Sequence, residues 1–117
     1  MKINSHKDLI VWQKAIELVI EIYRLTKLFP QSEKYNLISQ MRRCSVSIPS
    51  NIAEGKKRGT RKDYRQFLII SSGSGAELET QIEIAKRLGY ASPQNYKMVD
   101  NLLEEVMKIL TTIISKL

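Results

Sequence analysis

The residues with the clearest chemical character form a basic decapeptide, Lys56 to Arg65, which reads Lys-Lys-Arg-Gly-Thr-Arg-Lys-Asp-Tyr-Arg. Its six cations and one acid carry +5 of the formal net charge of +7. Closely spaced cations attract polyanions, and nucleic-acid phosphates are the most common polyanions in a cell. The pattern therefore indicates phosphate binding, although a well-solvated turn between two helices would have the same composition.

The candidate nucleic-acid-binding residues are the cations of this decapeptide and an upstream pair: Arg42, Arg43, Lys56, Lys57, Arg58, Arg61, Lys62 and Arg65. Arg42 and Arg43 either extend the basic surface or buttress it. Tyr64 is the one stacking candidate in the decapeptide and is itself expected in the core, so recognition of RNA or DNA backbone and shape is expected. The alternative is a protein-interaction scaffold whose basic rim docks an acidic partner such as a polymerase.

Residues for catalysis or metal binding are scarce. His6 is the only histidine, and Cys44 is expected to pack as a small hydrophobic residue on an apolar helix face. Di-iron helical bundles need Glu-x-x-His pairs, which a single histidine does not supply. Four glutamates, Glu54, Glu77, Glu79 and Glu83, are expected to pair with Arg42, Arg43 and Arg87. The sequence thus predicts no enzymatic activity, no cofactor and no metal.

Punctuation residues divide the chain into four predicted helices, at about 8–28, 33–57, 61–88 and 93 to the C-terminus. Pro30 stops the first helix, Thr60 caps the third, and Gly89 ends it before Ser92-Pro93 restarts the chain. Pro49 lies inside the second helix, as a kink or a break. Without strand signals, the sequence predicts one all-α domain, 1–117, folded as an antiparallel up-down-up-down four-helix bundle.

The first predicted helix carries two apolar stripes, wider than one bundle core requires. One stripe includes Trp12, Ile16, Val19 and Tyr23. The second includes the residues predicted to form an oligomer interface: Val11, Leu18, Ile22 and Leu25. Because monomers seldom expose large contiguous apolar patches, the surplus stripe predicts self-association, unless this helix is central and covered within one chain.

The third predicted helix contains a run of small residues, 71–76. Its apolar register turns Ser71 and Gly75 inward, where a bulky side chain such as Trp12 could approach closely. A phosphate-binding loop is the alternative, but the run lacks the following Lys-Ser/Thr and no strand precedes it. We therefore interpret the run as a packing feature.

A single cysteine excludes an intrachain disulfide, and no basic-then-apolar signal segment opens the chain. Charged residues interrupt the most hydrophobic stretch, so no segment is expected to cross a bilayer. A reducing cytoplasm and no membrane partner are the resulting expectations.

Several segments resemble one known family, the four helix bundle proteins. They are 8–15, 29–30, 40–43, 73–79 and, most specifically, Ser-Ile-Pro-Ser-Asn-Ile-Ala-Glu-Gly at 47–55. The family is also described as ribosomal-protein-like, because some members are encoded in intervening sequences of large-subunit ribosomal RNA genes. The chain is similar, too, to the accessory protein of diversity-generating retroelements, which engages reverse transcriptase and nucleic acid. The resemblance implies a homopentameric ring with a basic surface and no established enzymatic activity.

Overall fold

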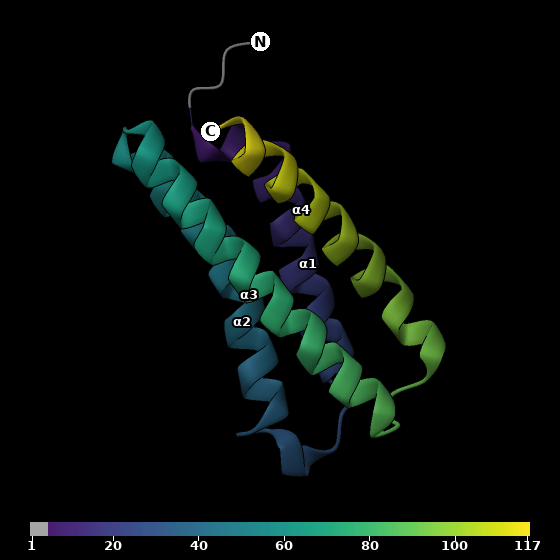
Figure 1. Cartoon of the computed structure of the whole chain (residues 1–117). Coiled ribbons are helices and arrows are strands. Elements are labelled where there is room, and N and C mark those ends of the chain that lie inside the picture. Colours follow the sequence, from purple (N-terminus) through teal and green to yellow (C-terminus); the bar gives the residue numbers. More distant parts are fainter. Residues whose placement is uncertain (1–4) are drawn as a thin grey trace.

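The computed structural model describes residues 5–117, and these residues form four α-helices and no strand (Figure 1). The helices are α1 (Ile10–Thr26), α2 (Leu37–Arg58), α3 (Arg61–Arg87) and α4 (Lys97–Lys116). Short 3₁₀ turns at His6–Asp8, Gln31–Glu33 and Pro93–Tyr96 precede α1, α2 and α4. The prediction of an all-helical chain with four helices is confirmed.

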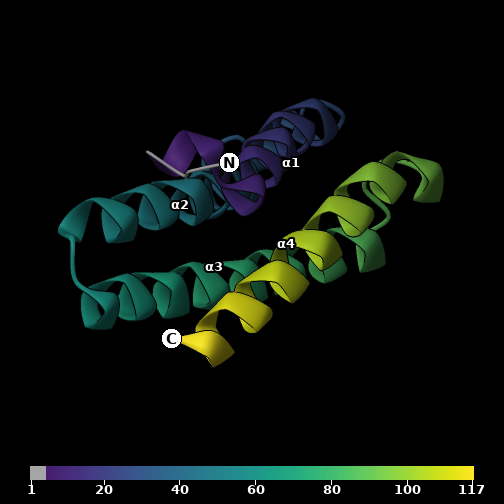
Figure 2. The same ribbon diagram turned by 90° about the horizontal axis from the view of Figure 1, so that it is seen from above.

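The four helices pack around a square. The main contacts join α1 to α2, α2 to α3, α3 to α4 and α4 back to α1, so α1 and α3 lie on a diagonal. In the view from above, α1 and α2 form one layer of the bundle, and α3 and α4 form the other (Figure 2). This arrangement is that of a four-helix bundle, in which each helix buries one apolar face against two neighbours.

Helix ends marked by specific residues lie where the sequence predicts them. The Thr60 side chain accepts a hydrogen bond from the Asp63 amide at 3.1 Å and caps α3. Beyond α3, Gly89 adopts a positive φ of 76°. Ser92 and Asn95 form a capping box at the turn before α4. Thr60 and Asn95 accept hydrogen bonds from backbone amides that the start of a helix leaves unpaired. Gly89 adopts the left-handed conformation that ends a helix.

The N-terminal ends of α1 and α2 differ from the prediction. The segment around Asp8 forms a separate 3₁₀ turn, so α1 begins at Ile10. Helix α2 begins at Leu37 rather than near Glu33, whose carboxylate accepts a hydrogen bond from the Leu37 amide at 3.3 Å. Glu33 therefore supports the start of the helix from outside it.

Pro49 lies inside a continuous α2. A proline in a helix interior costs about 3 kcal/mol, because it removes one amide donor and crowds the preceding turn. Here the proline is buried, and nearby side chains supply cross-helix bonds: the Ser71 hydroxyl donates to the Ile48 carbonyl at 2.9 Å, and Ser47 and Ser74 share a bond of 2.9 Å. Of the two outcomes left open by the sequence, a break of the helix is excluded.

The predicted inward orientation of Ser71 and Gly75 is confirmed, since both residues are buried. The bulky neighbour of Gly75 is nevertheless Met107 of α4, because a Cβ at position 75 would overlap the Met107 sulfur. Trp12 instead lies at the edge of the bundle, with its ring 5.1 Å from that of His6. The expected close approach of a bulky side chain is therefore made by Met107, and not by the example of Trp12.

Candidate nucleic-acid interface

Six cations surround the turn between α2 and α3, and we call this set the basic tip. It consists of Lys56, Lys57, Arg58, Arg61, Lys62 and Arg65, all of them exposed. The first three occupy the last turn of α2 and the others the first turns of α3. Figure 1 shows the turn between α2 and α3 at one end of the bundle, so all six decapeptide cations gather at that end.

Small and capping residues build the basic tip. Gly59 ends α2 with a φ of 88°, and Thr60 starts α3 immediately afterwards. One turn earlier, Gly55 lets α3 approach closely, since a Cβ at position 55 would lie only 2.6 Å from the Phe67 Cβ. The close approach holds the two antiparallel helices together at their ends and fixes the cations in one narrow projection.

Two cations of the tip cover its aromatic rings. The Lys56 ammonium lies 5.5 Å from the centre of the Tyr64 ring, and the Arg58 guanidinium lies 5.0 Å from that of Phe67. Both rings are half-buried, and burial raises the pKa of Tyr64 above its ordinary value. The aromatic groups of the tip therefore serve as supports for cations, which prefer the electron-rich ring face.

Arg61 joins the tip to the end of α4. Its Nη2 donates to the Lys116 carbonyl at 2.5 Å, and its Nε donates to the Leu117 carbonyl at 3.5 Å. A guanidinium at this place satisfies terminal carbonyls and complements the negative end of the helix dipole. The Arg61 contact holds the α2–α3 turn against the C-terminal end of α4.

The remaining three cations have no such engagement. Within residues 5–117, the structure records no ion pair, side-chain hydrogen bond or ring contact for Lys57, Lys62 or Arg65. Arg58, by comparison, pairs with Glu54 at 3.5 Å. Lys57, Lys62 and Arg65 therefore present fully available charge to a polyanion.

Arg42 does not belong to this surface. Its Nε donates to the Thr26 hydroxyl at 2.9 Å, its Nη2 donates to the Tyr23 carbonyl at 3.5 Å, and its guanidinium lies 4.5 Å from the centre of the Tyr23 ring. These contacts tie α2 to the end of α1. Of the two roles that the sequence leaves open for Arg42, extending the basic surface or buttressing it, these contacts fit the buttressing one.

Arg43 is exposed, but the structure separates it from the tip. Lys56 follows Arg43 by thirteen positions along α2, which is roughly 20 Å at 1.5 Å per residue. The predicted ion pairs of the glutamates are also redistributed: Arg87 pairs with Glu83 at 3.0 Å as expected, whereas Glu54 pairs with Arg58 instead of Arg42 or Arg43.

The four predicted interface residues of α1 lie in the core. Val11, Leu18, Ile22 and Leu25 are between 0% and 3% exposed. Their assignment to a subunit interface is therefore wrong, because no partner could reach them without opening the bundle. The sequence pattern identified two apolar stripes correctly but did not determine which one faces α2 and α4.

The other stripe of α1 remains partly open to solvent. Ile16, Ile20 and Tyr23 are 37%, 48% and 38% exposed, and Val46 of α2 is 40% exposed. We call these four residues the α1–α2 apolar face. Beside them lies a groove of about 270 Å³ lined by His6, Trp12, Ile16, Val19, Val46, Pro49, Ser50 and Ala53. Two residues of this face, Ile16 and Tyr23, belong to the first of the two apolar stripes predicted for α1.

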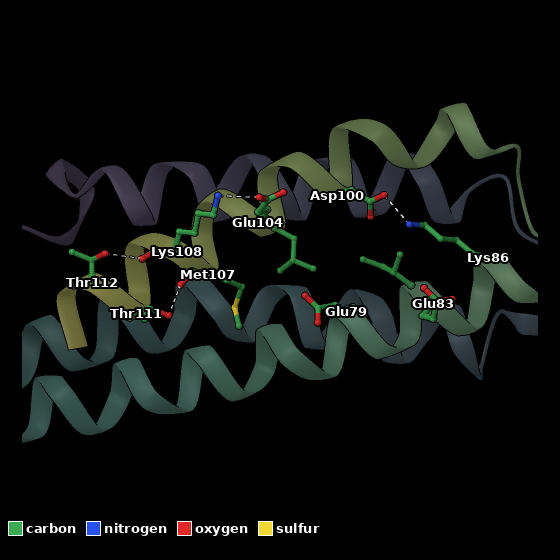
Figure 3. Close-up of a pocket in the computed structure, with 11 residues that line it drawn as sticks. Glu79, Glu83, Lys86, Asp100, Glu104, Met107, Lys108, Thr111 and Thr112 are labelled. Atoms are coloured by element: carbon green, nitrogen blue, oxygen red, sulfur yellow. Dashed lines mark hydrogen bonds and ion pairs between the residues drawn. The ribbon is translucent and has the colours of Figure 1, made fainter. Parts of the chain in front are cut away.

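A larger groove, of about 720 Å³, lies between α3 and α4 (Figure 3). Its floor includes Ile82 and Leu103, and Lys86 of α3 bridges to Asp100 of α4 at 2.7 Å. Carboxylates, lysines, threonines and apolar groups line the groove, without histidine or cysteine. This groove offers no nucleophile beside a base, and none of the tip cations lines it.

Cys44 is a buried thiol without nucleophilic character. Its Sγ donates to the Ser74 carbonyl at 3.0 Å. Burial, with a smaller contribution from Glu77, raises the pKa of Cys44 from 9.0 to about 11, so the thiol stays protonated at neutral pH. Across residues 5–117, no group of three or more His, Cys, Asp or Glu side chains is arranged to hold a metal ion.

None of the helices within residues 5–117 is both long enough and apolar enough to cross a membrane.

The predicted core assignment of Cys44 agrees with its burial. Of the predicted site residues, the structure therefore brings together the six decapeptide cations and separates Arg42 and Arg43 from them.

Comparisons with known proteins agree with this architecture. A family model described as 23S rRNA-intervening sequence protein matches residues 7–112. The crystal structure of a protein of unknown function from the S23 ribosomal protein family of Bacteroides thetaiotaomicron superposes with a TM-score of 0.82. The two chains are 28% identical, over 91% of this chain and 96% of the other. No curated protein matches the sequence, and neither description names an enzymatic activity.

Proposed function

Because the chain belongs to the 23S rRNA-intervening sequence protein family, we propose that it is a non-enzymatic nucleic-acid-binding protein whose basic tip holds backbone phosphates. The observation that carries the proposal is the set of three exposed, unengaged cations, Lys57, Lys62 and Arg65, beside three cations that are held by contacts of their own. The three cations held by contacts keep the tip in place, and the three unengaged cations neutralise phosphates.

Assembly is the second part of the proposal. The chain forms a homo-oligomer through the α1–α2 apolar face, and the family resemblance gives five as the number of subunits. Exposed bulky side chains at Ile16, Ile20, Tyr23 and Val46 support such a contact. Five tips on one particle raise the effective concentration of each for the next phosphate, so a modest affinity per tip suffices.

The binding proposal is tested with fluorescence anisotropy of labelled RNA and DNA at salt concentrations between 50 and 200 mM, a range in which phosphate contacts weaken steeply. A triple variant, Lys57→Gln, Lys62→Gln and Arg65→Gln, is compared with a control that removes three exposed cations elsewhere, Lys27→Gln, Lys34→Gln and Lys97→Gln. Both variants have the same net charge. A specific tip predicts a salt slope shallower by about three in the first variant only.

Equal losses in the two variants would show that total charge, and not the tip, governs binding. Phosphate contacts are strongest at the low end of the salt series. If no RNA or DNA binds even at 50 mM salt, the proposal is overturned. A nuclease-resistant complex with one acidic protein, lost in the tip variant alone, would then favour the interpretation as a protein-docking scaffold.

A further inference from the structure

The side chains of the basic-tip cations leave the α2–α3 hairpin in more than one direction. Lys56, Lys57 and Arg58 are consecutive in α2, so their side chains leave the helix about 100° apart. Lys56 consequently lies toward Tyr64, while Arg58 lies toward Phe67 and Glu54. Positive charge therefore faces more than one direction around a narrow projection.

The aromatic groups of the tip are unsuited to stacking with bases. Tyr64 and Phe67 are half-buried, and both contact the position of Gly55, where a Cβ would come within 3.3 Å of the Tyr64 ring. Lys56 and Arg58 cover their outer faces. Proteins that hold single strands combine a basic groove with open aromatic platforms. The tip has the charge of such a site without its platforms.

From this arrangement we infer that the basic tip recognises the phosphate rows of a duplex in preference to a single strand. The inference rests on the proposed function. A projection with cations on several sides can neutralise the two phosphate rows that border a duplex groove, whereas a single strand passes along one side only. The tip consists of two helix ends, each about 10–12 Å across, so either helix end by itself is comparable in width to the roughly 12 Å major groove of B-form DNA.

The recognised chemistry, two phosphate rows with no base contact, is common to RNA and DNA duplexes. The A-form major groove of RNA is too narrow for side chains to read, so an RNA duplex would be contacted along its backbone and its shallow groove. A B-form duplex would admit the tip more deeply. Comparing the affinity for the RNA duplex with the affinity for the DNA duplex therefore shows which nucleic acid supplies the phosphates.

The test uses the full chain in its natural assembly and four labelled probes: an RNA duplex and a DNA duplex of about 16 base pairs, a length that spans neighbouring grooves, and one strand of each. We expect either duplex to bind at least about tenfold more tightly than its own strand. The duplex salt slope should be about −0.9 per phosphate contact, against about −0.7 for a strand.

Single variants on the two helices sharpen the result. A duplex that straddles the tip touches both helices, so Lys57→Gln and Lys62→Gln should each reduce the duplex salt slope by about one, and the double variant by about two. Tyr64→Leu should change duplex and strand affinities by the same factor, because the ring supports Lys56 and does not stack on bases. Its melting temperature is measured in parallel, so that a folding defect is recognised.

Strands that bind as tightly as duplexes would overturn the inference. So would a loss of strand binding that exceeds the loss of duplex binding in Tyr64→Leu at an unchanged melting temperature, because the ring would then be a stacking platform. If none of the four probes binds, it is the proposed function that fails. The two kinds of failure are thus distinguishable.

Discussion

At the scale of single residues, similar side chains have different tasks because their neighbours differ. Arg42 and Arg43 are adjacent in sequence, yet Arg42 is bonded to Thr26 and Tyr23 of α1 while Arg43 is exposed. Arg61 and Lys62 show the same division, since Arg61 holds the end of α4. Composition identifies a cluster of cations, but only tertiary contacts separate structural cations from available ones.

Cys44 makes the stability of the fold depend on alkaline pH. Its pKa is raised from 9.0 to about 11 in the folded protein, so between these values the unfolded thiol loses its proton while the folded thiol retains it. The free energy of unfolding should therefore fall as the pH rises from 9 to 11, by at most about 3 kcal/mol from this group.

The measurement is urea unfolding of the wild type and Cys44→Ala at pH 8, 9.5 and 11. The stability difference between the two proteins should be largest at pH 8 and should shrink toward pH 11. Burial raises the pKa of Tyr96 from 10.0 to about 12, so this phenol also lowers the stability above pH 10, but it does so equally in the wild type and in Cys44→Ala. A difference that stays constant across the series would contradict the expected thiol shift.

At the scale of helices, local chemistry predicts the ends better than the faces. Thr60, Gly89 and Ser92 mark termini through bonds to nearby backbone, and these termini lie where the sequence places them. The sequence could not show which of the two stripes of α1 is buried, because both are apolar at helical spacing. Which stripe faces the core depends on contacts with helices distant in the sequence. The six tip cations were identifiable because they are contiguous, whereas the Arg42–Thr26 bond spans 16 residues.

Two glycines offer a matched test of how closely α2 and α3 approach. An alanine at Gly55 would place its Cβ 2.6 Å from the Phe67 Cβ, which is attached directly to the backbone, so the helices would have to move apart. Gly73 has nothing within 4 Å of the same added atom. Gly55→Ala should destabilise the fold by about 1–3 kcal/mol, as overpacking does.

Gly73→Ala should instead stabilise the fold by up to about 1 kcal/mol, because alanine is the better residue in an exposed helix interior. Thermal and urea unfolding of both variants give the comparison. Equal behaviour of the two would show that α2 and α3 are not closely packed at Gly55.

At the scale of the whole molecule, the α1–α2 apolar face lies along two helices and the free charge lies at one end of the bundle. We expect Ile16→Lys with Ile20→Lys to yield a smaller particle, because charge on the α1–α2 apolar face opposes burial against a second copy. Size exclusion with light scattering gives the mass, and Leu28→Lys with Met98→Lys, at exposed positions elsewhere, is the control.

If the mass is unchanged in the first pair but reduced in the control, the contact surface lies away from α1. The core residues Val11 and Leu18 are unsuitable for this test, since a lysine at either position would unfold the chain. Circular dichroism of each variant checks that the helices persist.

The position of Cys44 has a practical consequence for spectroscopy. It is the only cysteine in the sequence, and its protonated, buried sulfur is shielded from thiol-reactive dyes at neutral pH. A cysteine introduced at an exposed site such as Gln66 would therefore be the one labelled position. A single fluorophore there would lie one helical turn from Lys62 and directly after Arg65 in the sequence, and would follow events at the tip without the background of a native surface thiol.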